Sequence, residues 1–485
     1  MRATAPLPLL LIMKSHSWHK CEEKILDVYI LSSSVSLRQE FAMVQNLQPV
    51  LSDTEQPAAV DVVVIGGGIM GVCTAWNLVR AGVSVLLCEK GVIGGEQSSR
   101  NWGWVRKMGR DHREMPLMLR AMDIWAGLND AIDGETGFRV TGITYFAGGA
   151  SDIEKYRGWL ARISEFDLDT RVLSSEEAAH HAPGATRRFY GALHTASDGM
   201  AEPTLATSAI ASAARRAGCV ILQHCAARTV EMQGGKVAGV VTERGRVACK
   251  RVVLAAGGWS SLFLGNLGLR FPQLKILSQV MRSAPIETGL VGCGSGPGFG
   301  FRKRLDGGYN MSMRTGYPVD VVPDSFRFFK DFRPSLFSEH SSLKLRLGKR
   351  SLEEFVMRRR WRGDQVTPFE KYRVYDPAPG RHVLEGARKS FDEIFPAFRG
   401  ARIVESWGGL LDATPDAIPV ISGIDSHPGL FVSAGYSGHG FGLGPAAGQL
   451  MAELVQGTKP CVDPAPFRFG RFSDGTKIQY WPIGF

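Results

Sequence analysis

The sequence of 485 residues has few cysteines, and their arrangement excludes several classes of metal and redox protein. The eight cysteines form no C-x-x-C or C-x-x-x-x-C pair and show no metal-ligand spacing, which argues against a disulfide reductase and against a metal site. Several of them fall in apolar strand or helix patterns. They are therefore predicted to be small buried hydrophobic residues in a reducing compartment.

The sequence also lacks an apolar run long enough to cross a bilayer. The N-terminal run Pro6–Met13 has eight residues, and no small-residue cleavage site follows it, as a signal peptide would require. No transmembrane segment is predicted, and the expected location is cytoplasmic, with association at a membrane surface left open. Residues 1–56 are expected to be a disordered leader, in which Met43 is an alternative start to Met1.

The chain carries a net charge of +10, but no nucleic-acid module accompanies it. The densest basic part is Lys344–Arg362, for which a solvated helix face is the favoured interpretation and an anionic partner or lipid surface the alternative. With 44% hydrophobic residues, the chain is long enough to bury a large core, and two domains are expected.

A complete dinucleotide-binding unit occupies Val60–Lys90. An apolar, β-branched strand is followed directly by Gly66-x-Gly68-Ile69-Met70-Gly71, and the pattern of the next residues predicts a helix that stops at Gly82. Gly66 permits the tight turn, Gly68 leaves room for a pyrophosphate, and Gly71 lets the helix pack on the strand. The helix N-terminus then offers amides and a positive dipole end to the phosphates.

The second strand of this unit ends at Glu89, where a carboxylate can accept hydrogen bonds from a ribose 2′-hydroxyl and would repel a 2′-phosphate. NADP is therefore disfavoured. This unit alone leaves FAD and NAD open.

Three later segments favour a flavin. A polar loop after Glu89 contains Ser98, Ser99, Arg100 and Asn101, which can hydrogen-bond a flavin edge or pyrophosphate. Arg251–Ser261 reads as a buried strand that ends in a small-residue turn. In Glu405–Gly442 a strand leads through a glycine-rich turn toward a helix expected over Pro445–Val455, whose N-terminus can stabilise an electron-rich flavin edge.

Together these segments resemble the D-amino-acid oxidase superfamily of flavoproteins. The sequences VVVIGGGIMG, VVLAAGGWS, WGGLLDATPDAIPVI and GLFVSAGYSGHGFGLGPAAG follow the order and spacing of that family over most of residues 57–461. The resemblance implies an α/β fold with a glutathione-reductase-type FAD-binding Rossmann domain and a second, mainly antiparallel β substrate domain. The FAD domain is expected over 57–135, 196–268 and 400–461, the substrate domain over 136–195 and 269–399, and a C-terminal tail over 462–485.

The same resemblance assigns candidate cofactor contacts in addition to Glu89 and the glycine motif. These residues are Lys90, Ser98, Ser99, Arg100, Asn101, Ala227, Ala256, Gly257, Trp259, Gly409, Gly438, Gly440, Phe441 and Gly442.

Departures from the family pattern concern the tether and the electron acceptor. Sarcosine-oxidase-like members attach the flavin to a cysteine that would fall at Gly409, so noncovalent FAD is predicted. Their substrate-binding lysine would fall at Gly442. Their oxygen-activating lysine would fall within Tyr309–Arg314, which contains none, so a quinone or another acceptor is considered beside oxygen.

Three side chains are the candidate catalytic residues. Arg106 or Arg314 is expected to hold a substrate carboxylate with its planar guanidinium, although a surface salt bridge would explain either residue equally well. His439 is considered as a base or as a group that polarises the flavin carbonyl, and a brace for its turn is an equally good explanation.

The predicted activity is oxidation of the C–N bond of an amino acid or related secondary amine, giving an imine that hydrolyses to a 2-oxo acid. An FAD-dependent 2-hydroxy-acid dehydrogenase is the close alternative. An FAD-bearing electron-transfer subunit of a larger complex, with no substrate of its own, is the alternative from another class. The sequence leaves open the substrate, its stereochemistry and any partner subunit.

Overall fold

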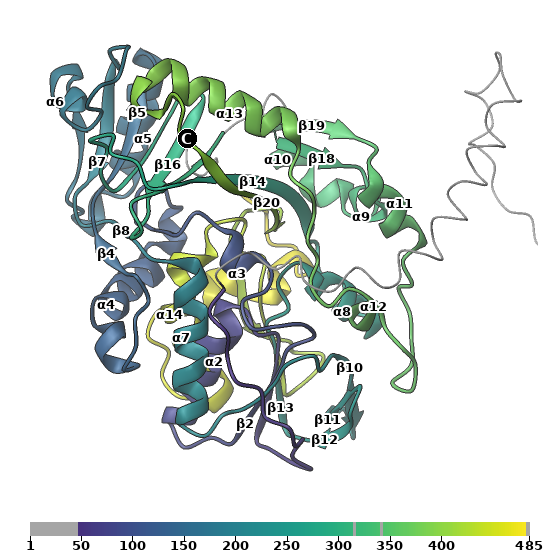
Figure 1. Ribbon diagram of the computed structural model, residues 1–485. Helices are drawn as coiled ribbons and strands as arrows, with labels where there is room; N and C mark the ends of the chain where they lie inside the picture. Colours follow the sequence, from purple (N-terminus) through teal and green to yellow (C-terminus); the bar gives the residue numbers. More distant parts are fainter. Residues whose placement is uncertain (1–46, 314–316, 340–342, 482–485) are drawn as a thin grey trace, which may run out of the picture. The chain divides into compact units, whose positions relative to one another are not determined.

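The computed structural model describes residues 47–313, 317–339 and 343–481. The chain divides into two units, Met1–Met43 and Val44–Phe485, and every element named below belongs to the second (Figure 1). Arg314, one of the two candidate carboxylate-binding residues, lies outside the described residues, as does the first part of the expected leader.

A six-stranded sheet forms where the sequence predicts the dinucleotide-binding unit (Figure 1). Its order is β21–β22–β13–β1–β2–β9, and every neighbouring pair is parallel except β21 with β22. The central strand β1 pairs with β2 and β13, so that Val62 lies opposite Val85 and Arg251. The strands are β1 Val62–Ile65, β2 Val85–Cys88, β9 Val220–Leu222, β13 Arg251–Leu254, β21 Val420–Gly423 and β22 Leu430–Ala434.

Two layers cover this sheet, because successive side chains of a strand point to opposite faces. Val62 and Val64 belong to a core shared with four helices, and Val63 and Ile65 belong to a core shared with a three-stranded antiparallel sheet. The helices are α2 Ile69–Arg80, α4 Met115–Ala131, α7 Pro203–Arg216 and α14 Gly440–Gln456. The antiparallel strands are β10 Ala227–Gln233, β11 Lys236–Thr242 and β12 Gly245–Ala248.

The second large sheet has eight strands in the order β20–β14–β17–β16–β15–β5–β7–β6, and only the pair β15–β5 is parallel. Helices α13 Arg381–Ile394 and α5 Ala150–Arg162 contribute buried residues to its two cores. The strands are β5 Ile143–Ala147, β6 Thr170–Leu173, β7 Gly191–Thr195, β14 Leu274–Ser283, β15 Cys293–Gly296, β16 Phe299–Lys303, β17 Tyr309–Ser312 and β20 Ile403–Ala413. The α/β class with a mainly antiparallel second sheet is confirmed.

Several expected boundaries are wrong. The strand β20 pairs with β14 along its whole length, so it belongs to the large antiparallel sheet although the FAD domain was expected to resume at residue 400. Helix α14 begins at Gly440 and not at Pro445. The proline lies inside the helix, in its second turn, where it removes the N–H that would bind the Phe441 carbonyl. Strands β10–β12 form an antiparallel meander, whereas β9 is an edge strand of the parallel sheet.

The remaining elements connect or flank these sheets. They are α3 Gln97–Arg100, β3 Trp104–Val105, a 3₁₀ turn at His112–Glu114, β4 Arg139–Val140, α6 Ser175–His180, β8 Gly199–Met200, α8 Ser260–Asn266, β18 Tyr317–Asp320, α9 Pro323–Arg327, α10 Phe329–Glu339, β19 Leu343–Arg346, α11 Lys349–Val356 and α12 Pro368–Lys371. None of the helices in the described ranges combines the length and apolar character needed to cross a membrane.

The basic run Lys344–Arg362 contains α11, in which Arg350 and Glu354 face inward whereas Lys349 is exposed. Arg350 and Glu354 are buried, while Leu352, Phe355 and Val356 are 64%, 58% and 83% exposed. The expectation of a solvated helix face is therefore wrong for this helix.

An ion-paired group holds the inward side of α11. Glu354 Oε1 accepts from Arg350 Nε at 2.9 Å and lies 2.8 Å from Lys275 Nζ of β14, and Arg350 Nη1 donates to the Lys275 carbonyl at 2.8 Å. These cations hold the pKa of Glu354 at about 2 although its burial acts in the opposite direction. Ion pairs thus hold α11 against the sheet, and the apolar side of the helix is exposed.

The stretch directly before β1 is ordered, so the expected disordered leader does not extend to residue 56. Gln48 N donates to the Thr204 carbonyl at 3.1 Å, and Gln223 Nε2 donates to the Val50 carbonyl at 2.8 Å. Asp53 pairs with Arg215 of α7 at 2.5 Å. These contacts fix residues 47–56 against α7 and the edge strand β9.

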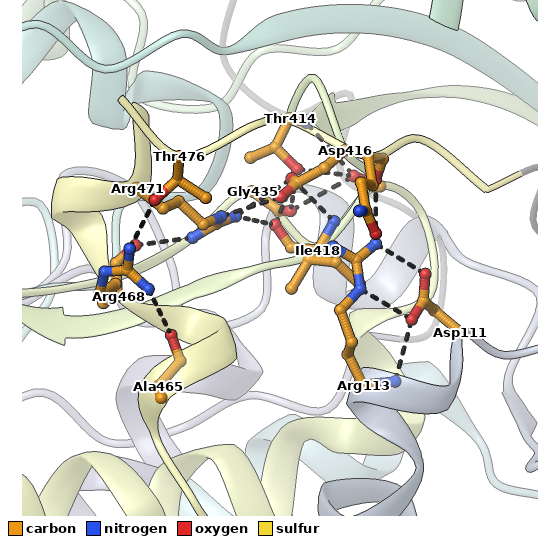
Figure 2. Close-up of polar contacts among 12 residues, drawn as sticks. Asp111, Arg113, Thr414, Asp416, Ile418, Gly435, Ala465, Arg468, Arg471 and Thr476 are labelled. Atoms are coloured by element: carbon orange, nitrogen blue, oxygen red, sulfur yellow. Dashed lines mark hydrogen bonds and ion pairs between the residues drawn. The ribbon is translucent and has the colours of Figure 1, made fainter. Parts of the chain in front are cut away.

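The C-terminal segment packs on the loop between β20 and β21 (Figure 2). Arg471 and Asp416 are both buried, and the guanidinium donates to both carboxylate oxygens at 2.9 and 3.2 Å. Arg471 also donates to the Ile418 carbonyl at 2.6 Å, and Thr414 Oγ1 donates to the same carbonyl at 2.8 Å. The tail is therefore an integral part of the unit that contains the parallel sheet.

Candidate active site

A cleft lies at the carboxyl edge of the parallel sheet, where β1, β2, β13 and β22 all end, and encloses about 1170 Å³ of space. Ligands in open parallel sheets bind at this edge. Its lining includes fifteen of the predicted cofactor residues. They are Gly66, Gly68, Ile69, Met70, Glu89, Lys90, Ser98, Asn101, Ala227, Ala256, Gly257, Trp259, Gly438, Gly440 and Phe441.

The glycine motif brings backbone segments closer together than side chains would allow. Gly66 has φ +111°, and a Cβ there would lie 2.4 Å from the Ala255 carbonyl oxygen. A Cβ on Gly71 would lie 1.9 Å from the Gly66 carbonyl oxygen. Gly68 is the N-cap of α2, and no acidic side chain lies in the first turn, so the amides of this turn can bind an anion.

Two polar side chains complete the α2 end of the cleft. Ser98 Oγ accepts from Ile69 N at 2.8 Å, and Glu89 accepts from Gly67 N and Gly91 N, both at 2.7 Å. Burial raises the pKa of Glu89, while Lys90 and the two amides act against that shift. Lys90 itself is turned toward other groups: its Nζ donates to the Tyr372 and Arg373 carbonyls at 2.7 and 2.9 Å and lies 4.8 Å from the centre of the Trp259 ring.

The other end of the cleft is formed by the first turn of α14 and by residues that sequence reasoning missed. Asp412 Oδ2 accepts from Gly435 N at 2.7 Å, and Gln97 Nε2 donates to its Oδ1 at 3.1 Å. Burial raises the pKa of Asp412 to about 6. An acidic residue within the otherwise apolar run WGGLLDA is the signal by which Asp412 could have been found. Tyr436 also lines the cleft, and its hydroxyl is within 2.8 Å of Ser433 Oγ.

Five predicted cofactor residues do not line this cleft: Gly71, Ser99, Arg100, Gly409 and Gly442. The Gly442 carbonyl accepts from Trp125 Nε1 at 2.8 Å, and a Cβ there would meet the Val105 Cα at 3.3 Å. This position is therefore packed against protein.

A second cavity of about 980 Å³ adjoins the cleft and shares five lining residues with it, Gln97, Asn101, Leu411, Gly438 and Phe441. Arginines and aromatic residues supply much of the rest of the lining: Arg100, Arg106, Arg110, Trp102, Trp104 and Tyr145. Gly409 also lies here. A small organic molecule of amino-acid size fits in such a cavity.

The three arginines of the second cavity are in different states. Arg100 is buried and donates to the Asp376 carboxylate and to the Gly408 carbonyl. Arg110 is also buried, and its two terminal nitrogens bind His439. Arg106 is only partly buried, donates to the Met108 carbonyl, and lies 6.0 Å from the centre of the Tyr145 ring. Arg106 is the guanidinium of the three that is placed to meet a ligand.

The candidate base His439 is buried and lines the second cavity. Its Nδ1 lies 3.0 Å from Arg110 Nη1, its carbonyl accepts from Arg110 Nη2 at 2.9 Å, and its Nε2 is buried without a hydrogen-bond partner among the described residues. Burial and the neighbouring Arg110 lower the pKa of His439 well below its ordinary value. The geometry therefore favours a structural role for His439, which braces its turn, over a role as a catalytic base.

The cleft fits FAD. It offers two helix N-termini without acidic residues in their first turns, a glycine cradle that any Cβ would obstruct, and a carboxylate at the end of β2. An extended dinucleotide needs such a site for its pyrophosphate, its ribose and its flavin edge. Fold and site together define a dinucleotide-binding flavoprotein.

Residues 61–454 match the model of the family described as FAD dependent oxidoreductase, abbreviated DAO. The chain belongs to this family, is an oxidoreductase, and uses FAD. It is similar to a glycine oxidase of Pseudomonas putida, with 27% identity over 84% of this chain and 97% of that protein. A sarcosine oxidase subunit beta of Rhodobacter capsulatus is 24% identical over 86% and 90% of the two chains.

A solved structure shows the same fold at higher identity. The L-amino acid deaminase from Proteus myxofaciens, in complex with anthranilate, is 33% identical, with a TM-score of 0.85 over 88% of this chain and 97% of that one.

We expect FAD to be bound without a covalent tether, because Gly409 offers no thiol. Acid precipitation should leave FAD in the supernatant, and flavin in the pellet would contradict this assignment. Gly68→Val should abolish FAD binding, since a Cβ there already lies 3.0 Å from Ser98 Oγ and the branched side chain would occupy the pyrophosphate space. Gly127→Val, in α4 with nothing within 4 Å of a new Cβ, is the matched control and should keep its flavin.

Proposed function

We propose that this protein oxidises the C–N bond of an amino acid, giving an imine that hydrolyses to a 2-oxo acid and ammonia or an amine. The observation that carries the proposal is the second cavity, which opens into the FAD cleft through five shared residues and contains Arg106. Bound FAD supplies a hydride acceptor to a substrate in this cavity. The protein must then orient the substrate, hold its carboxylate and exclude water.

Arg106 is the residue proposed to hold the carboxylate. A guanidinium pairs with a carboxylate through two parallel hydrogen bonds, and the Tyr145 ring beside it restricts its orientation. The rings of Trp102 and Trp104 pack edge to face, with their centres 4.8 Å apart, and form an apolar wall of the same cavity. This combination suits an α-amino acid with an apolar side chain.

The L-enantiomer is the proposed substrate form. Its support is the similarity to the L-amino acid deaminase from Proteus myxofaciens, which exceeds the similarity to the glycine oxidase of Pseudomonas putida in sequence identity. A 2-hydroxy acid, the close alternative, would use the same carboxylate contact. The cavity beside the cleft argues against an electron-transfer subunit without a substrate, while the match to a sarcosine oxidase subunit beta supports a partner subunit.

A quinone is the proposed electron acceptor. The segment Tyr309–Met313, where family members that react rapidly with oxygen place a lysine, contains none, and Tyr309 is buried with its hydroxyl donating to the Leu290 carbonyl at 2.8 Å.

Anaerobic mixing of the FAD-loaded protein with single substrates tests the donor and the acceptor together. We expect apolar L-amino acids to bleach the flavin, and D-amino acids, N-methylglycine and 2-hydroxy acids to do so slowly or not at all. After bleaching, a soluble quinone should restore the colour rapidly and air slowly. Bleaching by hydroxy acids alone would overturn the amino-acid assignment, and reoxidation by oxygen at the rate of turnover would make the protein an oxidase.

Replacement of Arg106 tests carboxylate recognition. Arg106→Leu should lower kcat/KM by about 2 to 4 kcal/mol, on the order of a hundredfold, because the buried substrate carboxylate loses its partner. Arg106→Lys should recover only part of the activity, since a point charge does not reproduce the planar fork. Flavin content should not change.

Two further variants complete this experiment. Arg157→Leu, which removes an exposed arginine of α5, is the control and should leave kcat/KM unchanged. Arg314→Leu tests the second candidate from the sequence. Normal activity of Arg106→Leu together with a hundredfold loss in Arg314→Leu would move carboxylate recognition to Arg314.

The apolar outer side of α11 supports a membrane-surface location for the protein. Beside Leu352, Phe355 and Val356, five more large apolar side chains within Phe326–Leu347 are exposed: Phe326, Phe329, Phe337, Leu345 and Leu347. Exposed basic residues, among them Lys344, Arg346 and Lys349, surround them. An apolar patch of this size with basic residues around it matches the interface of an anionic bilayer, where a quinone is also found.

Vesicle binding tests this location. The protein should sediment with vesicles of phosphatidylcholine and phosphatidylglycerol more than with phosphatidylcholine alone. The triple variant L352S/F355S/V356S should bind more than tenfold more weakly, given about 1 to 3 kcal/mol for each large apolar side chain removed from the lipid. The variant L51S/Y190S/V291S, with equally exposed residues elsewhere, is the control. Equal binding by both variants would refute the patch.

A further inference from the structure

Three side chains form a closed polar cluster behind the first turn of α14. Arg110 and Glu114 lie on the segment after β3, and His439 is the N-cap of α14. Glu114 Oε2 lies 3.7 Å from Arg110 Nη1 and 3.4 Å from His439 Nδ1. The side chain of Glu114 is fully buried, and neither of its oxygens has a hydrogen-bond partner among the described residues. A buried carboxylate in this state is costly and calls for an explanation.

The hydrogen bonds of Arg110 define the protonation of His439. A guanidinium only donates, so His439 Nδ1 must accept from Arg110 Nη1 and the proton of the neutral ring resides on Nε2. The single lone pair of Nδ1 accepts from Arg110, so Nδ1 cannot also accept from a proton on Glu114. The Glu114 carboxylate nevertheless lies 3.4 Å from this acceptor nitrogen, and one added proton on Oε2 would remove the negative charge that the nitrogen lone pair repels.

The surroundings of Glu114 favour its protonated form. Burial raises its pKa to about 8, and Asp111 acts in the same direction, while Arg110, Arg106 and Arg113 lower it. From the turn before α14, Tyr436 also faces this carboxyl, and burial raises the pKa of that phenol so that it stays neutral. The carboxyl is therefore the group in the cluster that changes charge near neutral pH.

The cluster is also placed to respond to the cofactor. His439 directly precedes Gly440 and Phe441, which line the FAD cleft, and the carbonyl of His439 is held by Arg110 Nη2. A hydride carries one net negative charge into the cleft when FAD is reduced. A negative charge added near a buried carboxyl raises the pKa of that carboxyl and draws a proton to it.

We propose that Glu114 is a redox-linked proton acceptor: its Oε2 binds one solvent proton when the bound FAD is reduced. One O–H bond forms on the protein and no other bond changes. Protonation removes the countercharge of Arg110, so a full positive charge then faces the α14 end of the cleft and offsets the charge of the reduced cofactor. This role rests on FAD binding and not on the identity of the substrate.

The midpoint potential of the flavin as a function of pH tests this proposal. Each proton coupled to a two-electron reduction contributes about 30 mV per pH unit to the slope of the midpoint potential. The proton within the hydride alone gives a slope of about 30 mV per pH unit, and one further proton at Glu114 raises the total slope to about 60 mV per pH unit. Below its pKa of about 8, Glu114 is protonated in both redox states and adds nothing. Above that pKa the oxidised protein has lost the proton and reduction restores it, so the slope should steepen.

In the variant Glu114→Gln the slope should stay at about 30 mV per pH unit over the whole pH range. The control is Glu354→Gln, which replaces a buried carboxylate that is ion-paired with Arg350 and Lys275. In this control the slope should steepen as in the wild type. Steepening retained in Glu114→Gln, or absent from the wild type, would overturn the proposal. If the glutamine variant fails to hold FAD, the infrared difference spectrum of the wild type on photoreduction at a pH above the pKa of Glu114 decides: a new protonated-carboxyl band is expected, and its absence refutes the role. Photoreduction needs no substrate, so this test is independent of the amino-acid assignment.

Discussion

The close packing of α2 on α14 is the contact on which both ends of the cofactor cleft depend. Three glycines at four-residue intervals make it possible: a Cβ on Gly440, Gly444 or Gly448 would lie 2.9, 2.5 or 2.4 Å from the side chains of Met70, Ile69 and Cys73 of α2. Because these glycines have no side chain, α2 packs directly on the backbone of α14, and the N-terminus of each helix reaches the same cleft. One helix end is thereby available to the pyrophosphate and the other to the flavin.

The elements that could be predicted from the sequence are those whose signals are local. The strand β1, the helix α2 and the strand β2 lie within thirty residues, and each is marked by its own periodicity or its own glycines. The strand β22 lies within Glu405–Gly442, where a strand was expected for the same reason. The start of α14 was placed too late because Pro445 suggested a helix beginning, whereas this proline lies inside the helix.

The features that could not be predicted from the sequence depend on contacts between distant segments. The outward apolar side of α11 follows from an ion pair between Glu354 and Lys275, and nothing near Glu354 in the sequence indicates that partner. Arg110 was not a candidate because its role depends on His439, 329 residues later, and the two residues meet only once the sheet has formed. A buried charge is identified by its partner, and single-sequence patterns do not reveal partners of this kind.

The pair between Arg471 and Asp416 has a consequence for the order in which the protein matures. Arg471 is synthesised after all strands of both large sheets and after α14, yet it donates to both oxygens of a buried carboxylate in the loop before β21. Until it leaves the ribosome, that loop contains a buried anion without its bidentate cation, which costs a folded chain several kcal/mol. The same loop is tied through Thr414 to Gly435, next to the turn that leads into α14. This part of the fold is therefore completed only after both large sheets and α14 have been synthesised.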